Sequence, residues 1–320
     1  MTASIFGPNV GEASPTFGPK IEAVIVYNSN PVAVAPDSSQ VARGFAREDL
    51  FTVVLEHFLT DTADHADYVL PATTQLEHWD AHMAYGHVYA MLNRPAIAPV
   101  GQALSNAEIF RRLAARMGFT EPCFSDSDET MALAAYSPEQ VNLDELKSRG
   151  WSRLNIADAP FAEGGFPTPN GKARVKPPGL DVPDHLPNYE SPQDTPALAA
   201  RYPLAMISPP ARNFLNSTFV NVDSLRKAER EPLVEIHPAD AAERGIADGA
   251  VIKVFNDRGT YVAKAAVSTR ARPGVVNGLG VWWRKMGLNG TNVNELTHQR
   301  LTDMGRAPTF YDCLVEVSLA

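Results

Sequence analysis

The sequence predicts an open α/β sheet domain followed by a compact all-β barrel domain, and three observations lead to this fold class. Short, β-branched apolar runs at residues 21–27 and 50–55 are typical of strands in a parallel sheet. A marked helical pattern at residues 105–117 follows them, so strands and helices alternate. From residue 202 onward the pattern changes to short strands separated by frequent turns, which favours a barrel.

The first half of the chain contains the elements expected of the sheet. The run at 21–27 (IEAVIVY) predicts a strand covered on both faces. Ser105 is the expected N-cap of the helix, with Glu108 three residues later and Gly118 at the end. Acidic and proline-rich stretches at 121–198 predict connections that cross to a second domain. In chain order we expect a strand at 21–27, a helix at 38–46, strands at 50–55 and 68–70, and a helix at 105–117.

The second half predicts short strands joined by tight turns. Asn256-Asp257-Arg258-Gly259 has the composition of a hairpin turn. The expected elements are a strand at 202–207, a short helix at 238–244, strands at 250–255 and 260–267, and a strand at 275–276. We therefore divide the chain into an irregular leader at 1–20, an α/β domain at 21–198 and a β-barrel domain at 199–320.

The composition indicates a soluble globular protein that binds small molecules. A formal net charge of -9 over 320 residues argues against non-specific nucleic-acid binding, which needs clustered Lys and Arg. No run of apolar residues is long enough for a membrane span, and the opening residues lack a secretory signal, so a cytoplasmic location is the default. The Gly-, Pro- and Ser-rich leader meets the first strand abruptly, as if a preceding domain were absent.

Cysteine and histidine give no clear metal site. The two cysteines, Cys123 and Cys313, form no CxxC pair for zinc or an iron–sulfur cluster, and free thiols are favoured over a disulfide. His78 and His82 have a helical spacing that would place two imidazoles on one face, with His87 nearby. Without HExxH we predict no metal there, and expect a substrate-facing group in this segment instead.

Polar residues at strand ends and in two later loops are the candidate ligand contacts. Asn28, Ser29 and Asn30 follow the first strand, where α/β sheets bind ligands, although for this fragment alone a simple Asn-Pro turn is favoured. The loop at 209–219 and the segment at 282–297 combine cations, amides and two indoles, for which buried Trp packing is the alternative. The sequence contains no GxGxxG, so a NAD-dependent dehydrogenase receives little support.

Together these segments resemble the molybdopterin oxidoreductase family, of the dimethyl sulfoxide reductase and formate dehydrogenase type. The resemblance covers the chain from about Ile21 to its end, and its segments occur in family order. They are YNSNPVAVAPD, DTADHADYVLPATTQLEHWD, ALSNAEIFRRLAARMGF, GGFPTPNGKARV, PPARNFLNSTF, HPADAAERGIADGAVIKVFNDRGTYVAKAAVSTRARPGVV and NVNELTHQRLTDMGRAPTFYD. The resemblance implies that the barrel is the family's double-psi β-barrel, the molybdopterin dinucleotide-binding domain.

The resemblance also implies two sets of residues that bind molybdopterin guanine dinucleotide. The set expected to face one guanosine end is Asn28, Asn30, Pro31, Thr62, Asp67, Pro71 and Glu77. The set expected to hold pterin or phosphate groups from the barrel is Arg212, Asn216, Ser217, Trp283, Asn294 and Asp303. No catalytic residue and no metal ligand is assigned.

The implied function is that of the C-terminal, cofactor-binding portion of a molybdenum-dependent oxidoreductase. With bound bis(molybdopterin guanine dinucleotide) molybdenum cofactor, such an enzyme transfers an oxygen atom, a hydride or electrons to a small substrate. Any iron–sulfur cluster is expected only on a missing N-terminal part, and that part or an electron-transfer subunit is the expected partner. We expect this chain alone not to be redox competent. The alternative is a non-catalytic module or remnant that only binds molybdopterin dinucleotide.

Overall fold

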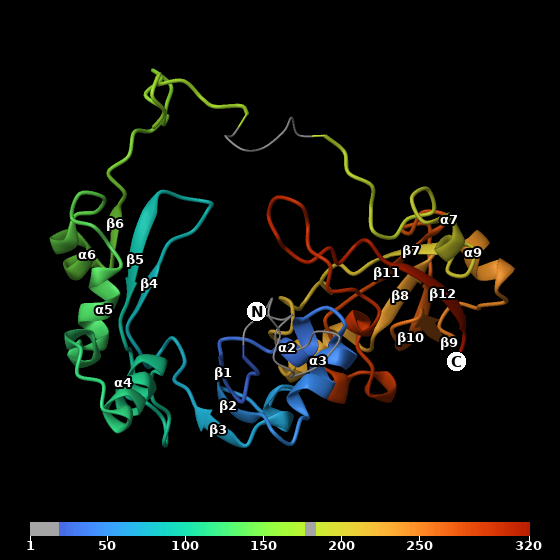
Figure 1. Ribbon diagram of the computed structural model, residues 1–320, viewed down its shortest axis with the longest axis horizontal. Coiled ribbons are helices and arrows are strands. Elements are labelled where there is room, and N and C mark those ends of the chain that lie inside the picture. The colour runs from blue at the N-terminus through green and yellow to red at the C-terminus, as the bar shows by residue number, and fades with distance from the viewer. Residues whose placement is uncertain (1–18, 177–183) are drawn as a thin grey trace. The chain divides into compact units, whose positions relative to one another are not determined.

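The computed structural model describes residues 19–176 and 184–320 (Figure 1). The chain divides into two compact units, which are described separately below. The first unit comprises Met1–Val69 and Leu186–Ala320, and the second comprises Leu70–His185. The domain boundaries expected from the sequence stay a prediction, because compactness and family domains are different criteria.

The first unit contains a small α/β sheet. Strands β1 (Ala23–Tyr27), β2 (Phe51–Glu56) and β3 (Tyr68–Pro71) are arranged in the order β1-β2-β3 (Figure 1), and β1 runs parallel to β2. Helices α2 (Pro31–Val34) and α3 (Ser38–Phe45) cover one face, where apolar side chains of both layers pack together. The α/β architecture expected from the sequence is confirmed.

The other face of this sheet differs from the expectation. The strand at 21–27 was expected to be covered on both faces, but Ile25 is 39% exposed and Tyr27 is 49% exposed. Val24 and Val26, which alternate with them, pack toward the helices. The expectation is wrong because an apolar run predicts burial on both faces, whereas the described residues supply helices to one face only.

The rest of the first unit is a closed barrel of six strands among the described residues. The strands are β7 (Leu204–Ile207), β8 (Leu233–Ile236), β9 (Val251–Phe255), β10 (Thr260–Val267), β11 (Val275–Gly278) and β12 (Leu314–Leu319). They close in the order β10-β8-β11-β7-β12-β9, with parallel and antiparallel pairs. The predicted barrel and the hairpin between β9 and β10 are confirmed. Sequence analysis missed β8 and β12.

A continuous core fills the barrel, and short helices connect its strands. Met206, Ile236, Ile252 and Tyr261 are among its buried side chains. The helices and 3₁₀ turns of the first unit, besides α2 and α3, are η1 (Ala63–His65), α7 (Pro196–Ala199), α8 (Asp223–Glu229), α9 (Pro238–Glu243), η3 (Arg284–Met286), η4 (Leu288–Gly290) and η5 (Val293–Glu295). The short helix expected at 238–244 is confirmed by α9.

The second unit is built on an antiparallel sheet in the order β4-β5-β6. Its elements are β4 (Asp80–His82), β5 (Tyr89–Asn93), α4 (Asn106–Met117), η2 (Pro122–Ser125), α5 (Asp128–Ala134), α6 (Leu143–Arg149) and β6 (Trp151–Arg153). Buried Leu92, Ala132 and Leu146 belong to one apolar cluster. The helix at 105–117 is confirmed: the Ser105 side chain accepts from the Glu108 N–H, and Gly118 ends the helix with a left-handed backbone.

Two expectations for this unit are wrong. Residues 121–198 were expected to be connections, but they contain α5, α6 and β6, whose capped turns and short periods are weak sequence signals. His78 and His82 do not share a helical face, because His82 lies in β4 and His78 precedes that strand. The i, i+4 spacing was therefore a coincidence of sequence.

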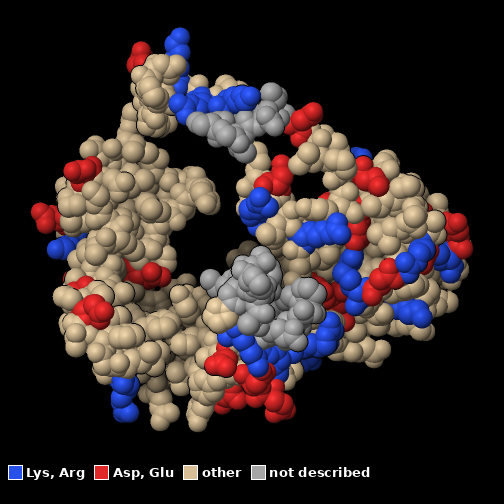
Figure 2. All heavy atoms as spheres, viewed as in Figure 1, with Lys and Arg blue, Asp and Glu red and all other residues tan. Residues whose placement is uncertain are grey.

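The described surface mixes charges of both signs. On the face drawn in Figure 2, Lys and Arg lie among Asp and Glu over the barrel. Within the described residues, no helix has the length and apolar character that crossing a bilayer requires.

Candidate functional site

The end of β1 leads into a buried polar contact between two predicted site residues. Asn28 adopts a left-handed backbone with φ 53°, which turns the chain toward α2. Asn30 is buried, and its Oδ1 accepts hydrogen bonds from the Thr62 N–H (3.2 Å) and from Thr62 Oγ1 (2.7 Å). Thr62 Oγ1 in turn accepts from the Val32 N–H at 3.1 Å. Residues that are 32 positions apart in sequence thus fix the start of α2 together.

Asp61, next to Thr62, ties this corner to the segment that follows β11. Its carboxylate accepts from the backbone N–H of Arg284 at 2.6 Å and of Lys285 at 3.4 Å. Burial raises the pKa of Asp61, and these backbone donors oppose that rise. Lys285 Nζ also donates to Asp64 at 2.8 Å. The corner of the α/β sheet and the η3 turn are therefore held as one piece.

Asn294 makes a second connection between the same two parts. Its Nδ2 donates to the carbonyl oxygen of Ala33 in α2 at 3.0 Å, and its own N–H donates to Asn292 Oδ1 at 2.8 Å. Asn292 and Glu295 form a capping box around η5. Asn294 is thus a buried structural side chain in this structure.

The loop after β7 approaches η3 through Trp283. Trp283 Nε1 donates to the Ser217 carbonyl oxygen at 2.7 Å, and both Trp282 and Trp283 are only 3% exposed. They belong to an apolar cluster with Ala211, Phe214 and Val220. The alternative of buried Trp packing is therefore what the structure shows, and it brings Ser217 to η3.

We call the set Asn30, Asp61, Thr62, Ser217, Trp283 and Arg284 the corner network. Two of its donors, Asn30 Nδ2 and Arg284 Nη1, are buried and have no hydrogen-bond partner within the described part of the chain. A buried donor without an acceptor is costly, so it commonly indicates a missing ligand or water. Two such donors suit a ligand that is rich in acceptor oxygens, such as a phosphate or a heterocyclic carbonyl.

Exposed polar side chains lie on the loop beside the corner network. Arg212 and Asn216 are exposed, and Asn216 has a left-handed backbone with φ 51°. Asn213 anchors this loop, because its N–H and Nδ2 donate to Glu229 Oε1 at 2.6 and 2.7 Å. The loop is therefore fixed at its base and presents an arginine and an amide at its surface.

The remaining predicted residues are not members of the corner network. Pro31 opens α2, and Asp67 Oδ2 accepts from the Thr52 N–H at 2.6 Å beside β2. Asp303 is exposed in the loop closed by the bridge between Leu301 and Pro308. Pro71 and Glu77 belong to the second unit.

Glu77 has intramolecular partners for both carboxylate oxygens. Oε2 accepts from the Thr74 N–H and Oγ1 at 2.7 Å each, and Oε1 accepts from the Val100 N–H at 2.7 Å. These contacts give Glu77 a turn-stabilising role in this structure.

Sequence analysis missed Asp61, Arg284 and Lys285 as site residues. A signal was present, since Asp61 immediately precedes Thr62 and the two cations immediately follow Trp283. The spacing of more than 220 positions between Asp61 and Arg284 gave no reason to pair them.

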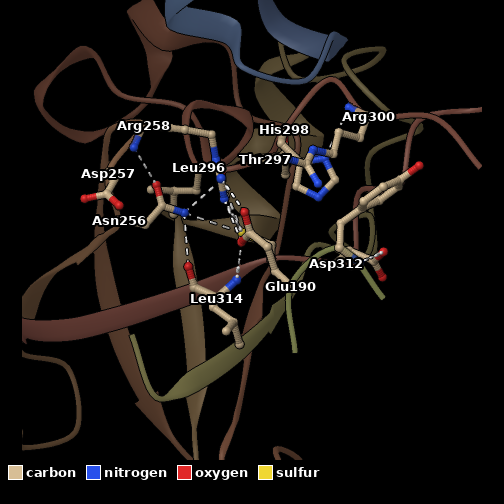
Figure 3. Close-up of polar contacts among 12 residues, drawn as sticks. Glu190, Asn256, Asp257, Arg258, Leu296, Thr297, His298, Arg300, Asp312 and Leu314 are labelled. Atoms are coloured by element: carbon tan, nitrogen blue, oxygen red, sulfur yellow. Dashed lines mark hydrogen bonds and ion pairs between the residues drawn. The ribbon is translucent and has the colours of Figure 1, made fainter. Parts of the chain in front are cut away.

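A largely buried ion pair between Arg258 and Glu190 holds the chain that follows η5. Arg258 Nη1 and Nη2 donate to Glu190 at 2.5 and 3.0 Å, and Arg258 Nε donates to the Leu296 carbonyl at 2.6 Å. Glu190 also accepts from the Leu314 N–H at 2.9 Å. In Figure 3, Arg258 points to Glu190, and the Asn256 amide donates to the carbonyl oxygens of Leu296 and Leu314. We call Glu190 and Arg258 the barrel clamp, because they fix the chain after η5 to β12.

Two histidines line a cavity of the second unit, and both cysteines are free thiols. His82 and His87 line a surface cavity of about 670 Å³ in the second unit, together with Tyr89, Met91 and Trp151. Cys123 is exposed and Cys313 is buried, and both are free thiols, as expected from the sequence. Burial raises the pKa of Cys313 to about 12, so this thiol stays protonated.

Comparison with known families gives two matches on this chain. Residues 10–116 match the family described as "Molybdopterin oxidoreductase", and residues 204–314 match "Molydopterin dinucleotide binding domain". Every residue of the corner network lies in one of the two matched regions.

Individual relatives agree with the family matches. The "Probable oxidoreductase YoaE" of Bacillus subtilis is 38% identical over 93% of this chain and 44% of its own length. "Dimethyl sulfoxide reductase DmsA" of Escherichia coli is 31% identical over 83% of this chain and 37% of its own length. A solved structure, acetylene hydratase from Pelobacter acetylenicus, superposes with a TM-score of 0.80 at 22% identity, over 100% of this chain and 46% of its own. The chain thus spans less than half the length of each of these relatives.

Proposed function

Because the chain belongs to the molybdopterin oxidoreductase family, whose members include dimethyl sulfoxide reductases and formate dehydrogenases, we propose that it holds one part of a molybdopterin guanine dinucleotide cofactor. In this role it is the C-terminal, cofactor-binding portion of an oxidoreductase that acts on a small substrate. The observation that carries the proposal is the corner network, in which residues of both matched regions are hydrogen-bonded to each other and two buried donors lack a partner among the described residues.

The donors of the corner network fit the chemistry of this cofactor. Phosphate oxygens and the carbonyl edges of guanine and pterin are acceptors, so Asn30 Nδ2 and Arg284 Nη1 would each gain the partner that they lack. Thr62 and Asp61 act indirectly: Thr62 orients the Asn30 amide, and Asp61 fixes the backbone at Arg284. Trp283 holds the 209–219 loop beside them through Ser217.

The exposed predicted residues extend this site toward solvent. We propose that Arg212 and Asn216 contact phosphate or pterin groups, since their loop is anchored by Asn213 and their side chains are exposed. Asn28 and Pro31 bracket Asn30 at the end of β1, and we keep them as guanosine contacts. Asp67, Pro71, Glu77, Asn294 and Asp303 stay predictions carried by the family resemblance. We further propose that the six-stranded barrel is of the double-psi type.

The bound cofactor would supply the redox chemistry, and this chain would supply binding and orientation. The buried Trp pair excludes water from one side of the corner network, and the side chains of Arg284 and Lys285 are ion-paired there with Glu295 and Asp64. We place any iron–sulfur cluster on a polypeptide outside this sequence, because its two cysteines are isolated from each other.

Cofactor content tests the proposal. The chain is produced in a host that makes molybdopterin guanine dinucleotide, and the purified protein is assayed for oxidised pterin and for GMP released by acid. We expect pterin and GMP in equal amounts from the wild-type chain. Loss of one charged hydrogen bond weakens binding by about 1.5–3 kcal/mol, so Arg284→Met should retain roughly tenfold less of both.

A matched control separates binding from folding. Arg201→Met removes an arginine that pairs with Asp257 on the barrel exterior, and it should leave pterin content unchanged. Recovery of pterin without GMP would contradict the dinucleotide form. A wild-type chain that retains no pterin would rule out that this chain holds the cofactor by itself.

A further inference from the structure

The sheet of the second unit has a cavity on one of its faces. Helices α5 and α6 lie on the other side of the strands (Figure 1), where Ala90 and Leu92 of β5 belong to the apolar core of this unit. Tyr89 and Met91 alternate with them along β5 and are 39% and 36% exposed. The cavity has a volume of about 670 Å³, and we call it the aromatic cavity. Its lining includes His82, His87, Tyr89, Met91, Asn93 and Trp151.

Three side chains of the aromatic cavity form a row across the sheet. His82 of β4 lies opposite Met91 of β5, and Met91 lies opposite Trp151 of β6. Directly opposite residues of neighbouring strands present their side chains on the same face. Tyr89 lies two positions before Met91 and therefore shares that face, and its ring centroid is 5.5 Å from that of Trp151. This wall of aromatic rings and a thioether suits a flat apolar ring.

The charges around the aromatic cavity are paired outside its lining. The guanidinium carbon of Arg149 lies 4.0 Å from the centroid of the Trp151 ring, and its charge is paired with Glu145. Within the described part of the chain, the lining itself contains no Lys, Arg, Asp or Glu. A charged ligand would lose water there without meeting an opposite charge in the lining, so the cavity favours a neutral molecule.

Donor groups outnumber acceptor groups in the aromatic cavity. The Nδ1 atom of His87 accepts from the Tyr89 N–H at 3.2 Å, so the proton of the neutral imidazole lies on Nε2, which is a donor. The Trp151 indole N–H and the Tyr89 hydroxyl are two further donors. Asn93 Nδ2 donates to two backbone carbonyl oxygens at 2.7 Å each, which leaves Oδ1 as the acceptor of this amide. A ligand oxygen that accepts hydrogen bonds therefore matches this lining.

We propose that the aromatic cavity binds a neutral planar aromatic molecule that carries an acceptor oxygen. Its volume lies in the range of sites for small organic molecules. The ring would lie against Trp151 and Tyr89, and the oxygen would accept from donors such as His87 Nε2. Quinones and aromatic N-oxides share this chemistry. The site belongs to the second unit, so it holds even if no cofactor is bound; only the use of an N-oxide as substrate would rest on the proposed function.

An NMR titration of the chain tests this site. The indole N–H resonance of Trp151 is identified as the one that Trp151→Phe lacks, and it is followed during addition of tetramethyl-1,4-benzoquinone or quinoline N-oxide. This quinone has no free ring position that the exposed thiol of Cys123 could attack. We expect at least one compound to shift the Trp151 resonance, with a dissociation constant of about 1 mM or lower. The compound that binds more tightly identifies the source. Trimethylamine N-oxide has the oxygen but no ring, and it should leave the resonance in place.

Three variants separate the aromatic wall from the donor, with binding measured by saturation-transfer NMR of the ligand. Trp151→Leu should weaken binding roughly tenfold through loss of the ring contact. His87→Phe keeps a ring but removes the donor, and it should weaken binding roughly fivefold. Tyr85→Ala removes an exposed ring of the β4–β5 hairpin that is not in the lining, and it should leave binding unchanged.

The side chains of Trp151, His87 and Tyr85 lie outside the apolar core cluster of this unit, so circular dichroism of the variants should match that of the parent. The proposal is overturned if neither compound shifts the Trp151 resonance. It is also overturned if Tyr85→Ala weakens binding as much as Trp151→Leu, or if Trp151→Leu and His87→Phe both bind as the wild-type chain does.

Discussion

Single polar side chains decide how the corner network is held together. Thr62 uses its hydroxyl twice, donating to Asn30 Oδ1 and accepting from the Val32 N–H. The Asn30 amide is thereby oriented with its Nδ2 group unpartnered. A buried hydroxyl of this kind is a structural residue whose effect on a ligand would pass through its neighbour.

Replacing Thr62 by Val tests this role. The substitution keeps the size of the side chain but leaves the Val32 N–H and Asn30 Oδ1 with fewer partners. We expect the free energy of unfolding to fall by about 1–3 kcal/mol, measured by urea denaturation. Thr62→Ser retains the hydroxyl and should cost clearly less; equal losses for the two variants would show that the methyl group, not the hydroxyl, matters.

His298 gives the first unit a pH dependence. Burial lowers the pKa of His298 below its ordinary value of 6.5, while the nearby charges of Glu190 and Asp312 oppose the shift and Arg258 and Arg300 support it. The unfolded chain therefore takes up a proton first as the pH falls. The stability contributed by neutral His298 is complete above about pH 7 and declines as the pH drops through 6.5.

The expected result is a stability difference that changes with pH. Between pH 7.5 and pH 5.5 the wild-type chain should lose more stability in urea than His298→Gln, which cannot titrate. The comparison cancels the contributions of other groups, including His65, whose pKa burial also lowers. Parallel pH profiles for the two proteins would contradict this assignment.

At the scale of elements, short turns and strands are held in place by polar contacts from distant segments. The turns η3 and η5 have three residues each, too few to be stable alone. Asp61 holds the first through two backbone N–H groups, and the Asn292–Glu295 capping box holds the second. The barrel clamp then fixes the chain beyond η5 to β12.

The barrel clamp is expected to contribute strongly to stability. Glu190 is largely buried, so Arg258→Met would leave its carboxylate without a counter-charge and should cost about 3–5 kcal/mol. Arg201→Met removes an arginine from the exposed pair with Asp257 and should leave the urea midpoint nearly unchanged. Similar losses for both variants would show that burial of the pair does not set its importance.

At the scale of the whole molecule, the chain matches less than half the length of its relatives. It spans 44% of the Bacillus subtilis relative and 46% of the acetylene hydratase chain. At the proposed cofactor site, two buried donors have no partner among the described residues. A redox centre needs its cofactor enclosed and oriented from all sides.

We therefore expect the isolated chain to bind cofactor without turnover. The pterin content of the purified chain is measured first. The chain is then mixed with reduced viologen and with dimethyl sulfoxide or trimethylamine N-oxide, the compounds that appear in the names of two relatives. No substrate-dependent viologen oxidation is the expected outcome. Sustained oxidation by the wild-type chain, in proportion to its pterin content, would show that this portion is competent alone.

The sequence by itself determined the fold class and about half of the helices and strands, in their correct order. Long or well-capped segments have strong local signals: the helix begun by Ser105 and the hairpin at Asn256–Gly259 follow from capping and turn chemistry alone. The family resemblance likewise depends on ordered local motifs, and both family matches agree with it. Strands β8 and β12 were missed, although β8 is as long as the predicted strand β7, so strand length alone does not explain the omission.

Only the tertiary structure decided which polar residues meet. Asp61 pairs with Arg284 across more than 220 positions, and Glu190 meets Arg258 across 68, so neither contact has a local signal. The same is true of burial: an apolar strand predicts cover on both faces, but which face is covered depends on helices placed elsewhere in the chain. The sequence around Trp283 is compatible with a ligand contact or with a buried position. In the structure Trp283 is buried in an apolar cluster with Phe214 and Val220.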